Sequence, residues 1–393
     1  MATPLCYNSI WFFLCEDMRI CVSRSFPLFF SLSPSTSLPS GSFASRMCTF
    51  SPVAMAVDTK HADLKAENDR AKLVIVGHRG CGKNRTYSVG ETPDFTPSIR
   101  ENTITSFNLA AKYGADFVEF DVQVTKDGHA IIFHDDLIIA EDMVPSSIGN
   151  LTLEEFLSFG PQKESNKIGK TLVRVATDGT VSVWSATVED SLCTLKEAFE
   201  QVEPIVGFNI EVKFDDINPV SQSELERVVT AVVQEVEQHA KARNIFFSSF
   251  HPDAVGLLQK SQSKYPVFFL TDGGTHLYAD ERRNSIEAAM EVCNKSGLQG
   301  IVSEVKGVLQ NPNLVAQIKK AELHLFTYGD LNNVPEVVQK QKDLGVDGVI
   351  VDHVLEIVTA CKAWVETATL EVLSTSGLEQ PPSTECSDII SQI

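Results

Sequence analysis

Three carboxylates stand inside stretches of sequence that are otherwise hydrophobic. Glu119 and Asp121 lie two residues apart in segment 117–124, and Glu211 lies in segment 207–213. If both segments are strands, Glu119 and Asp121 share a face, because alternate strand residues point the same way. They would then lie about 6.6 Å apart and repel each other by roughly 2–3 kcal/mol at an effective dielectric constant near 20. The three acids therefore need positive charge beside them.

Acidic oxygen ligands select a hard cation, so these residues predict a site for Mg²⁺, with Ca²⁺ as the alternative ion. Arg79 and Lys213 stand near the acids in the sequence pattern and leave a second interpretation open. In that interpretation the acids form salt bridges and bind no metal. Acids in the middle of apolar strands are uncommon, which favours the metal site.

Two histidines stand at the ends of further candidate strands. His78 follows the apolar segment 73–77, and His134 ends the segment 130–134. Two imidazoles beside a cation-bound anion can act as general base and general acid in the cleavage of a phosphodiester, each contributing about 10²–10⁴-fold. The nearby arginine and lysine would supply the positive charge that a phosphoryl group needs. A purely structural role for each histidine is the alternative.

The place of His134 depends on the turn that precedes it. The link Thr125–Gly128 after segment 117–124 is too short for a parallel crossover and predicts an antiparallel hairpin. With a two-residue loop, Thr125 pairs with Gly128, and counting along the ladder puts His134 opposite Glu119.

Nine short segments rich in β-branched and aromatic residues predict strands, and helical periods lie between most of them. They are 73–77, 117–124, 130–134, 207–213, 245–250, 267–271, 300–305, 323–328 and 346–352. Without the return strand of the hairpin, eight strands remain, with gaps long enough for crossovers. This pattern predicts an α/β fold, a TIM (β/α)8 barrel with an inserted β-hairpin after strand 2. The carboxyl ends of the strands, where a TIM barrel has its active site, carry the acids and histidines.

The composition argues against two classes of partner. The chain has 393 residues, with 33 Lys and Arg against 52 Asp and Glu, and a net charge of −19. This charge argues against binding of nucleic acid and against docking on anionic lipid. The absence of an apolar run of eighteen residues predicts no membrane insertion. The nine cysteines lack the spacing of a zinc site or disulfide framework, which favours free thiols.

The segments that carry this chemistry resemble, in order, the glycerophosphodiester phosphodiesterases. The matching segments are His78-Arg79-Gly80, Glu101-Asn102-Thr103, the run from Gly114 to Val122, Thr125 to Gly128, His134-Asp135, Asn209 to Lys213, Ser249-Phe250, and Gly345 to Asp352. The resemblance covers residues 73–360. The phrase from Phe247 to Ala254 is similar to the plant branch that includes a plastid enzyme.

This resemblance implies a barrel of the PI-phospholipase C-like phosphodiesterase type and a metal-dependent hydrolase. The implied reaction converts glycerophosphodiesters (glycerophosphocholine, glycerophosphoethanolamine, glycerophosphoglycerol and similar) to sn-glycerol 3-phosphate and an alcohol, within glycerol and phospholipid metabolism. By resemblance, the metal ligands are Glu119, Asp121 and Glu211, the catalytic base and acid are His78 and His134, the phosphate-binding residues are Arg79 and Lys213, and Tyr328 lines the glycerol side.

Several features leave alternatives open. Arg100 stands where the family usually has proline, and a late aromatic, often Trp in a Trp-Thr context, appears here as Phe326-Thr327-Tyr328. Cys81, near His78, is either an incidental small residue or a redox-sensitive thiol. Segment 160–189 has no predicted role. A phospholipase-type lyase that forms a cyclic phosphate and a non-catalytic binding protein are the alternative functions. The sequence does not determine the oligomeric state.

The first 57 residues differ in composition from the rest. They contain eleven serines, three arginines, no lysine and two acids, which predicts a transit peptide and a location in the plastid stroma. A secretory signal at residues 10–14 is the alternative, and Met47 and Met55 offer internal starts for a cytosolic form. We expect a charged connector at 58–71, the barrel domain at 72–370 and a disordered tail at 371–393.

Overall fold

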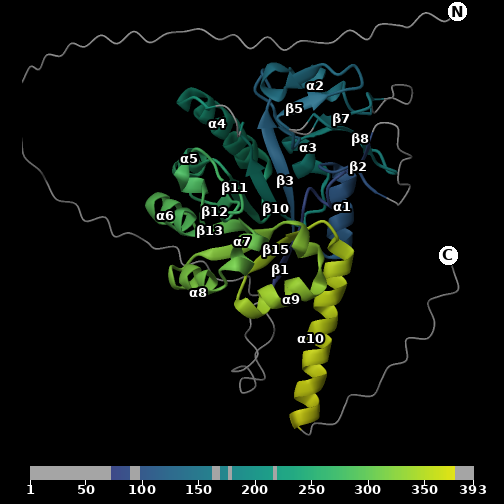
Figure 1. The fold of residues 1–393 in the computed structure, drawn as a ribbon. Helices are drawn as coiled ribbons and strands as arrows, with labels where there is room; N and C mark the ends of the chain where they lie inside the picture. The colour runs from purple at the N-terminus through teal and green to yellow at the C-terminus, as the bar shows by residue number, and fades with distance from the viewer. Residues whose placement is uncertain (1–71, 89–97, 162–168, 176–178, 216–218, 377–393) are drawn as a thin grey trace, which may run out of the picture. The chain divides into compact units, whose positions relative to one another are not determined.

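The computed structural model describes residues 72–88, 98–161, 169–175, 179–215 and 219–376 (Figure 1). The predicted transit peptide and connector and the last part of the predicted tail lie outside the described residues. Eight parallel strands close into a barrel, confirming the predicted TIM fold. In order around the barrel they are β1 (Val74–Gly77), β3 (Phe117–Val124), β10 (Gly207–Val212), β11 (Ile245–Ser249), β12 (Val267–Thr271), β13 (Gly300–Glu304), β14 (His324–Tyr328) and β15 (Gly348–Val351).

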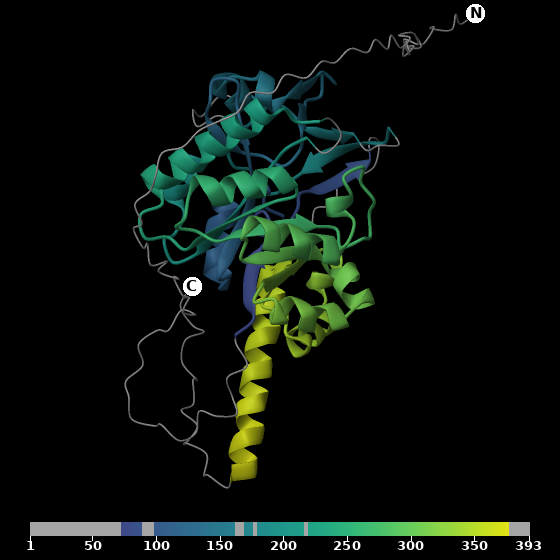
Figure 2. The same cartoon turned by 90° about the vertical axis from the view of Figure 1, so that its left-hand side faces the viewer.

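Helices connect successive strands and cover the outside of the barrel (Figures 1 and 2). They are α1 (Ile104–Tyr113), α3 (Leu195–Gln201), α4 (Gln222–His239), α5 (Pro252–Ser261), α6 (Ile286–Ser296), α7 (Val305–Gln310), α8 (Asn313–Lys320), α9 (Pro335–Leu344) and α10 (Val354–Ser376), with 3₁₀ turns η2 (Glu281–Arg283) and η3 (Asp330–Asn333). The last helix packs against α1, α9 and β1 and runs past residue 370, where the sequence placed the end of the barrel domain. No helix among the described residues is long and apolar enough to cross a membrane.

The sequence of α4 shows why a helix forms and which face it buries. Ser221 caps the first turn by accepting a hydrogen bond from the backbone N–H of Glu224. Six apolar residues at helical spacing then follow, and all are buried: Leu225, Val228, Val229, Val232, Val233 and Val236.

Large apolar side chains fill the inside of the barrel. The group comes from six of the eight strands and consists of Val76, Phe246, Phe268, Leu270, Val302, Phe326 and Ile350. Three of the rings pack against one another, with the centroid of Phe246 lying 4.9 Å from that of Phe268 and 5.4 Å from that of Phe326. Because this interior is packed, polar residues at the strand ends form a site at the mouth instead of lining a channel.

The hairpin after β3 is present, but its register differs by one residue from the prediction. β4 (Ala130–Ile132) pairs antiparallel with β3, and Val124 faces Ala130. Thr125 therefore faces His129, to which its backbone N–H donates, and the loop has three residues. The third, Gly128, adopts a φ of +87°, the left-handed conformation that a three-residue hairpin loop requires. The prediction that His134 lies directly opposite Glu119 is therefore wrong.

Further elements, all but β2 of them between β4 and α3, pack beside the hairpin. β5 (Leu137–Ile139) pairs with β6 (Pro145–Ser147), and η1 (Ile148–Asn150) and α2 (Leu153–Leu157) follow. β2 (Arg85–Ser88), β8 (Val181–Ser185) and β7 (Val173–Val175) form a separate three-stranded sheet, while β9 (Cys193–Thr194) pairs with β4. A second apolar core, which includes Phe133, Phe156 and Trp184, holds this region together. Two strands of the inserted three-stranded sheet, β7 and β8, come from segment 160–189.

Candidate active site

The barrel brings the three predicted metal-binding acids together. Glu119 and Asp121 come from β3, and Glu211 comes from β10, where it pairs in register with Asp121. All three are buried, and one carboxylate oxygen from each lies within 4.8 Å of the others. Parallel pairing of neighbouring strands at equal height, with alternate residues facing the mouth, produces this cluster.

The three acids carry more negative charge than the basic side chains beside them neutralise. Burial, followed by the charges of Asp121 and Glu211, raises the pKa of Glu119 well above its usual range. Burial also raises the pKa of Glu211, and Lys213 offsets only part of this effect. For Asp121, nearby basic side chains outweigh burial and lower the pKa.

Salt bridges from lysine and arginine reach two of the three acids. Lys213 Nζ lies 3.2 Å from Glu211 Oε1 and 3.5 Å from Asp121 Oδ1, and Arg79 Nε lies 3.5 Å from Asp121 Oδ2. Within the described residues, no lysine or arginine lies within ion-pair distance of Glu119. One oxygen of Glu119 accepts a 2.9 Å hydrogen bond from the backbone N–H of Arg79, while the other is buried without a hydrogen-bond partner. This orphaned oxygen is what a hard cation would bind, so the donor set fits Mg²⁺ or Ca²⁺.

Each predicted histidine is paired with a carboxylate. His78 Nδ1 lies 2.8 Å from Asp352 Oδ1 at the end of β15, and its Nε2 lies 3.9 Å from Glu119 Oε2. His134 Nδ1 lies 2.7 Å from Asp135 Oδ1. A carboxylate on Nδ1 fixes the tautomer and the ring, and it leaves Nε2 free for proton transfer.

The two histidines and the three acids line one cavity. Its volume is about 330 Å³, and Arg79, Lys213, Tyr328 and Asp352 also contribute to its wall. Burial, together with the positive charges of Lys213 and Arg79, lowers the pKa of His134 to about 4 in the metal-free protein. The cavity thus joins two histidines, a carboxylate cluster and cationic side chains at the carboxyl ends of the strands.

The segment Glu101-Asn102-Thr103 supports this arrangement. Glu101 accepts a 2.9 Å bond from Arg79 Nη1, and Asn102 Nδ2 donates to Asp121 Oδ2 at 2.9 Å. Thr103 caps α1. Arg79 and Asn102 both have positive φ, of 49° and 57°, an uncommon backbone conformation that clusters at functional sites.

The sequence profile of the glycerophosphoryl diester phosphodiesterase family matches residues 78–356. The chain belongs to this family.

Plant relatives agree with that membership, and a solved structure shares the fold. The chain is 53% identical over 287 residues to glycerophosphodiester phosphodiesterase GDPD2 of Arabidopsis thaliana, covering 72% of this chain and 76% of that one. It is 52% identical over 303 residues to a second enzyme of the same plant, named "Glycerophosphodiester phosphodiesterase GDPD1, chloroplastic". This match covers 76% of this chain and 82% of that one. A phosphodiesterase of Oleispira antarctica, solved with the product sn-glycerol-3-phosphate, is similar in fold, with a TM-score of 0.52, 21% identity, and coverage of 74% of this chain and 96% of that one.

Compared with the family pattern, Arg100 has a structural partner here. Its Nε donates to Glu189 Oε2 at 2.5 Å, and its guanidinium carbon lies 5.6 Å from the centre of the Trp184 ring. Arg100 therefore ties the segment that enters α1 to the inserted region.

Tyr328 lines the cavity at the end of β14. Its hydroxyl donates to Asp272, which also accepts a 2.5 Å bond from Tyr278, and its ring packs edge-on against Phe250 with centroids 6.0 Å apart. Burial, followed by the charge of Asp272, raises the pKa of Tyr328 well above its usual range, so the hydroxyl stays protonated. Tyr328 can offer substrate an aromatic edge and a hydroxyl already held in place.

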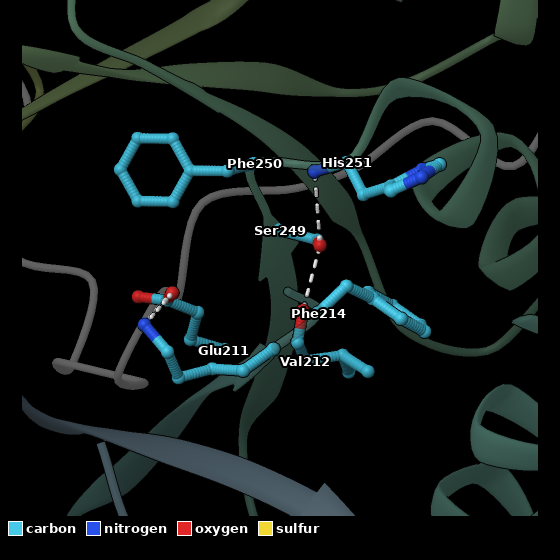
Figure 3. Close-up of a pocket in the computed structure, with 7 residues that line it drawn as sticks. Glu211, Val212, Phe214, Ser249, Phe250 and His251 are labelled. Atoms are coloured by element: carbon cyan, nitrogen blue, oxygen red, sulfur yellow. Dashed lines mark hydrogen bonds and ion pairs between the residues drawn. The ribbon is translucent and has the colours of Figure 1, made fainter. Parts of the chain in front are cut away.

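The end of β10 is anchored to β11 (Figure 3). Ser249 Oγ donates to the backbone carbonyl of Val212 at 2.7 Å and accepts from the N–H of His251. Figure 3 also shows the Glu211 carboxylate on one side of this anchor and the rings of Phe214 and His251 on the other. The cavity that these residues line, about 10 Å³, has room for no more than one water. The bond from Ser249 to Val212 ties the residue next to Glu211 to β11.

Cys81 is half-buried and packs against the main apolar core. Burial raises the pKa of its thiol to about 12. A reactive thiol needs a lowered pKa, so of the two interpretations the incidental small residue fits the structure.

Sequence reasoning assigned no role to four carboxylates and bases that hold the site. Three of them lie in the motifs that match the family: Glu101, Asp135 and Asp352. Each is a carboxylate that pairs with a basic residue at a strand end, and this pairing was the signal that could have revealed them. Arg174 gave no signal, because only the folding of the inserted sheet brings it to the site.

Proposed function

We propose that this chain hydrolyses glycerophosphodiesters, including glycerophosphocholine, to sn-glycerol 3-phosphate and a free alcohol. The observation that carries the proposal is the pair of carboxylate-held histidines, His78 and His134, in one cavity with the three clustered acids. Family membership and the product seen in the Oleispira structure support it.

Glu119, Asp121 and Glu211 would hold one divalent cation, which we take to be Mg²⁺, with Ca²⁺ as the alternative. Such an ion, when bound, neutralises phosphate charge and orients the phosphoryl group. The buried Glu119 oxygen without a hydrogen-bond partner supports this assignment, because the salt bridges of Arg79 and Lys213 go to Asp121 and Glu211 and do not neutralise the charge of Glu119.

The remaining steps belong to protein side chains. Arg79 and Lys213 hold the phosphate oxygens, since both cations line the cavity and lie beside Asp121. One of the two histidines, His78 and His134, accepts the proton of the attacking water, and the other protonates the leaving alcohol oxygen. Asp352 and Asp135 hold these rings and stabilise the imidazolium form of each. Tyr328 contacts the glycerol side.

The substrate should be deacylated and water-soluble. A cavity of about 330 Å³ accommodates a glycerophospho group with a small head group and lies near the lower end of the usual range for ligand pockets. We expect glycerophosphocholine, -ethanolamine, -glycerol and -inositol to be cleaved, and intact phosphatidylcholine to be a poor substrate.

A direct assay tests this function. Purified protein should release choline and sn-glycerol 3-phosphate from glycerophosphocholine with Mg²⁺ and lose activity reversibly with a chelator. A cyclic phosphate product would indicate the lyase alternative, and binding without turnover would indicate the non-catalytic one. Turnover of micellar phosphatidylcholine with an equal or higher kcat/KM would contradict the proposed substrate class.

We also propose that residues 1–57 direct the protein to the plastid stroma. Their Ser- and Arg-rich, acid-poor composition supports this location, and so does the relative named chloroplastic. Translation from Met47 or Met55 would give a cytosolic form.

A further inference from the structure

The inserted sheet places an arginine directly against the partner of His134. Arg174, in β7, donates from Nε to Asp135 Oδ2 and from Nη2 to Asp135 Oδ1, both at 2.9 Å. This is a bidentate contact, the geometry in which a guanidinium holds a carboxylate most firmly. Asp135 Oδ1 in turn binds His134 Nδ1, so one chain of contacts runs from the insert to the imidazole.

Other contacts hold Arg174 itself in place. Its guanidinium carbon lies 5.2 Å from the centre of the Trp184 ring on the paired strand β8. Trp184 is buried and stacks on Phe133, with centroids 5.7 Å apart and planes 21° apart. Phe133 is the residue before His134. An aromatic stack therefore connects the arginine to the backbone that carries the histidine.

A second carboxylate lies near the same guanidinium. Arg174 Nη2 is 3.6 Å from Glu101 Oε1, the atom that also binds Arg79. Burial would raise the pKa of Glu101, but Arg79 and then Arg174 outweigh it and lower this pKa. Arg174 is thus held between two acids that are ionised, and it has little freedom to turn away.

We propose that Arg174 is a positioning residue for the phosphodiester cleavage. It fixes the Asp135 carboxylate, and Asp135 fixes the ring orientation and tautomer of His134. Segment 160–189 therefore contributes to catalysis through one side chain that does not itself line the substrate cavity. The inference rests on the proposed function.

The size of the effect follows from what outer partners of functional histidines contribute. Loss of such a partner costs about 10–100-fold in activity. We expect Arg174→Gln to lower kcat for glycerophosphocholine by a factor in that range. Arg174→Lys keeps the positive charge beside Asp135 and the packing on Trp184 but cannot form the bidentate contact. Its kcat should therefore lie between those of Arg174→Gln and the wild-type protein.

A double-mutant cycle separates positioning from simple stability. Arg174→Gln is measured in the wild-type protein and in the His134→Ala background, with the folded fraction checked by melting temperature. If Arg174 acts through His134, the substitution should change kcat by less than about threefold in the His134→Ala background. Arg227→Gln is the matched control, because Arg227 also pairs with an acid and bonds the carbonyls of Thr125 and Val124, outside the cavity.

Three results would overturn the inference. They are an unchanged kcat in Arg174→Gln, the same fold-loss in both backgrounds, and a loss in Arg227→Gln that shows the same dependence on His134. A wild-type protein without activity, or an unimpaired His134→Ala variant, would instead contradict the proposed function. The two failures are therefore distinguishable.

Discussion

Replacing Glu119 by glutamine should have opposite effects on the metal-free and metal-bound protein. The ligand oxygens of Glu119, Asp121 and Glu211 lie within 4.8 Å of one another. Two unit charges at that distance repel by about 3.5 kcal/mol at an effective dielectric constant near 20. Arg79 and Lys213 offset part of this repulsion through Asp121 and Glu211, so we expect Glu119→Gln to stabilise the metal-free protein by about 1–2 kcal/mol.

The glutamine can keep the existing contact of this side chain. Its carbonyl oxygen can accept the hydrogen bond from the backbone N–H of Arg79, and its amide can donate toward the remaining acids. In chelator at pH 8, the melting temperature should therefore rise by about 2–6 °C. The same variant should bind Mg²⁺ at least about tenfold more weakly, because it loses one charged ligand.

Differential scanning calorimetry with chelator and with Mg²⁺ measures both effects. Glu154→Gln on α2, which removes an exposed carboxylate outside the cavity, is the control and should change neither value. A variant that is less stable than wild type in chelator would refute the electrostatic reasoning. Unchanged Mg²⁺ affinity would remove Glu119 from the metal site.

Three further predictions follow from the site and the sequence. His134→Ala should lower kcat by at least about 100-fold while the melting temperature stays within a few degrees, because the ring is only half-buried; an active or unfolded variant would contradict the acid–base role. The raised pKa of Glu119 means that the folded metal-free protein binds a proton that the unfolded chain has lost, so its stability should fall as pH rises above the ordinary glutamate range. The increase in melting temperature on adding Mg²⁺ should accordingly be larger at pH 8 than at pH 5, and a smaller increase at pH 8 would oppose this interpretation. Residues 1–57 fused to a fluorescent protein should direct it to the plastid stroma, and secretion or a purely cytosolic signal would refute the transit peptide.

The sequence alone determined the barrel and which residues face its mouth. Strand alternation in segments 117–124 and 207–213 places the acids on one face, and this local pattern depends only on backbone geometry. All eight barrel strands lie within three residues of the predicted bounds, because apolar runs and helical periods are local signals.

Tertiary structure decided how those residues are held. The hairpin register depends on Gly128 taking a left-handed conformation in a three-residue loop, and the sequence is also compatible with a two-residue loop. The partners of the two histidines differ in kind: Asp135 adjoins His134, whereas Asp352 is 274 residues from His78 and reaches it only because β15 closes the barrel against β1. Arg174 depends on the packing of a separate sheet against Phe133 and Trp184. Local periodicity fixes which face a side chain points to, but contacts between distant segments exist only once the chain has folded.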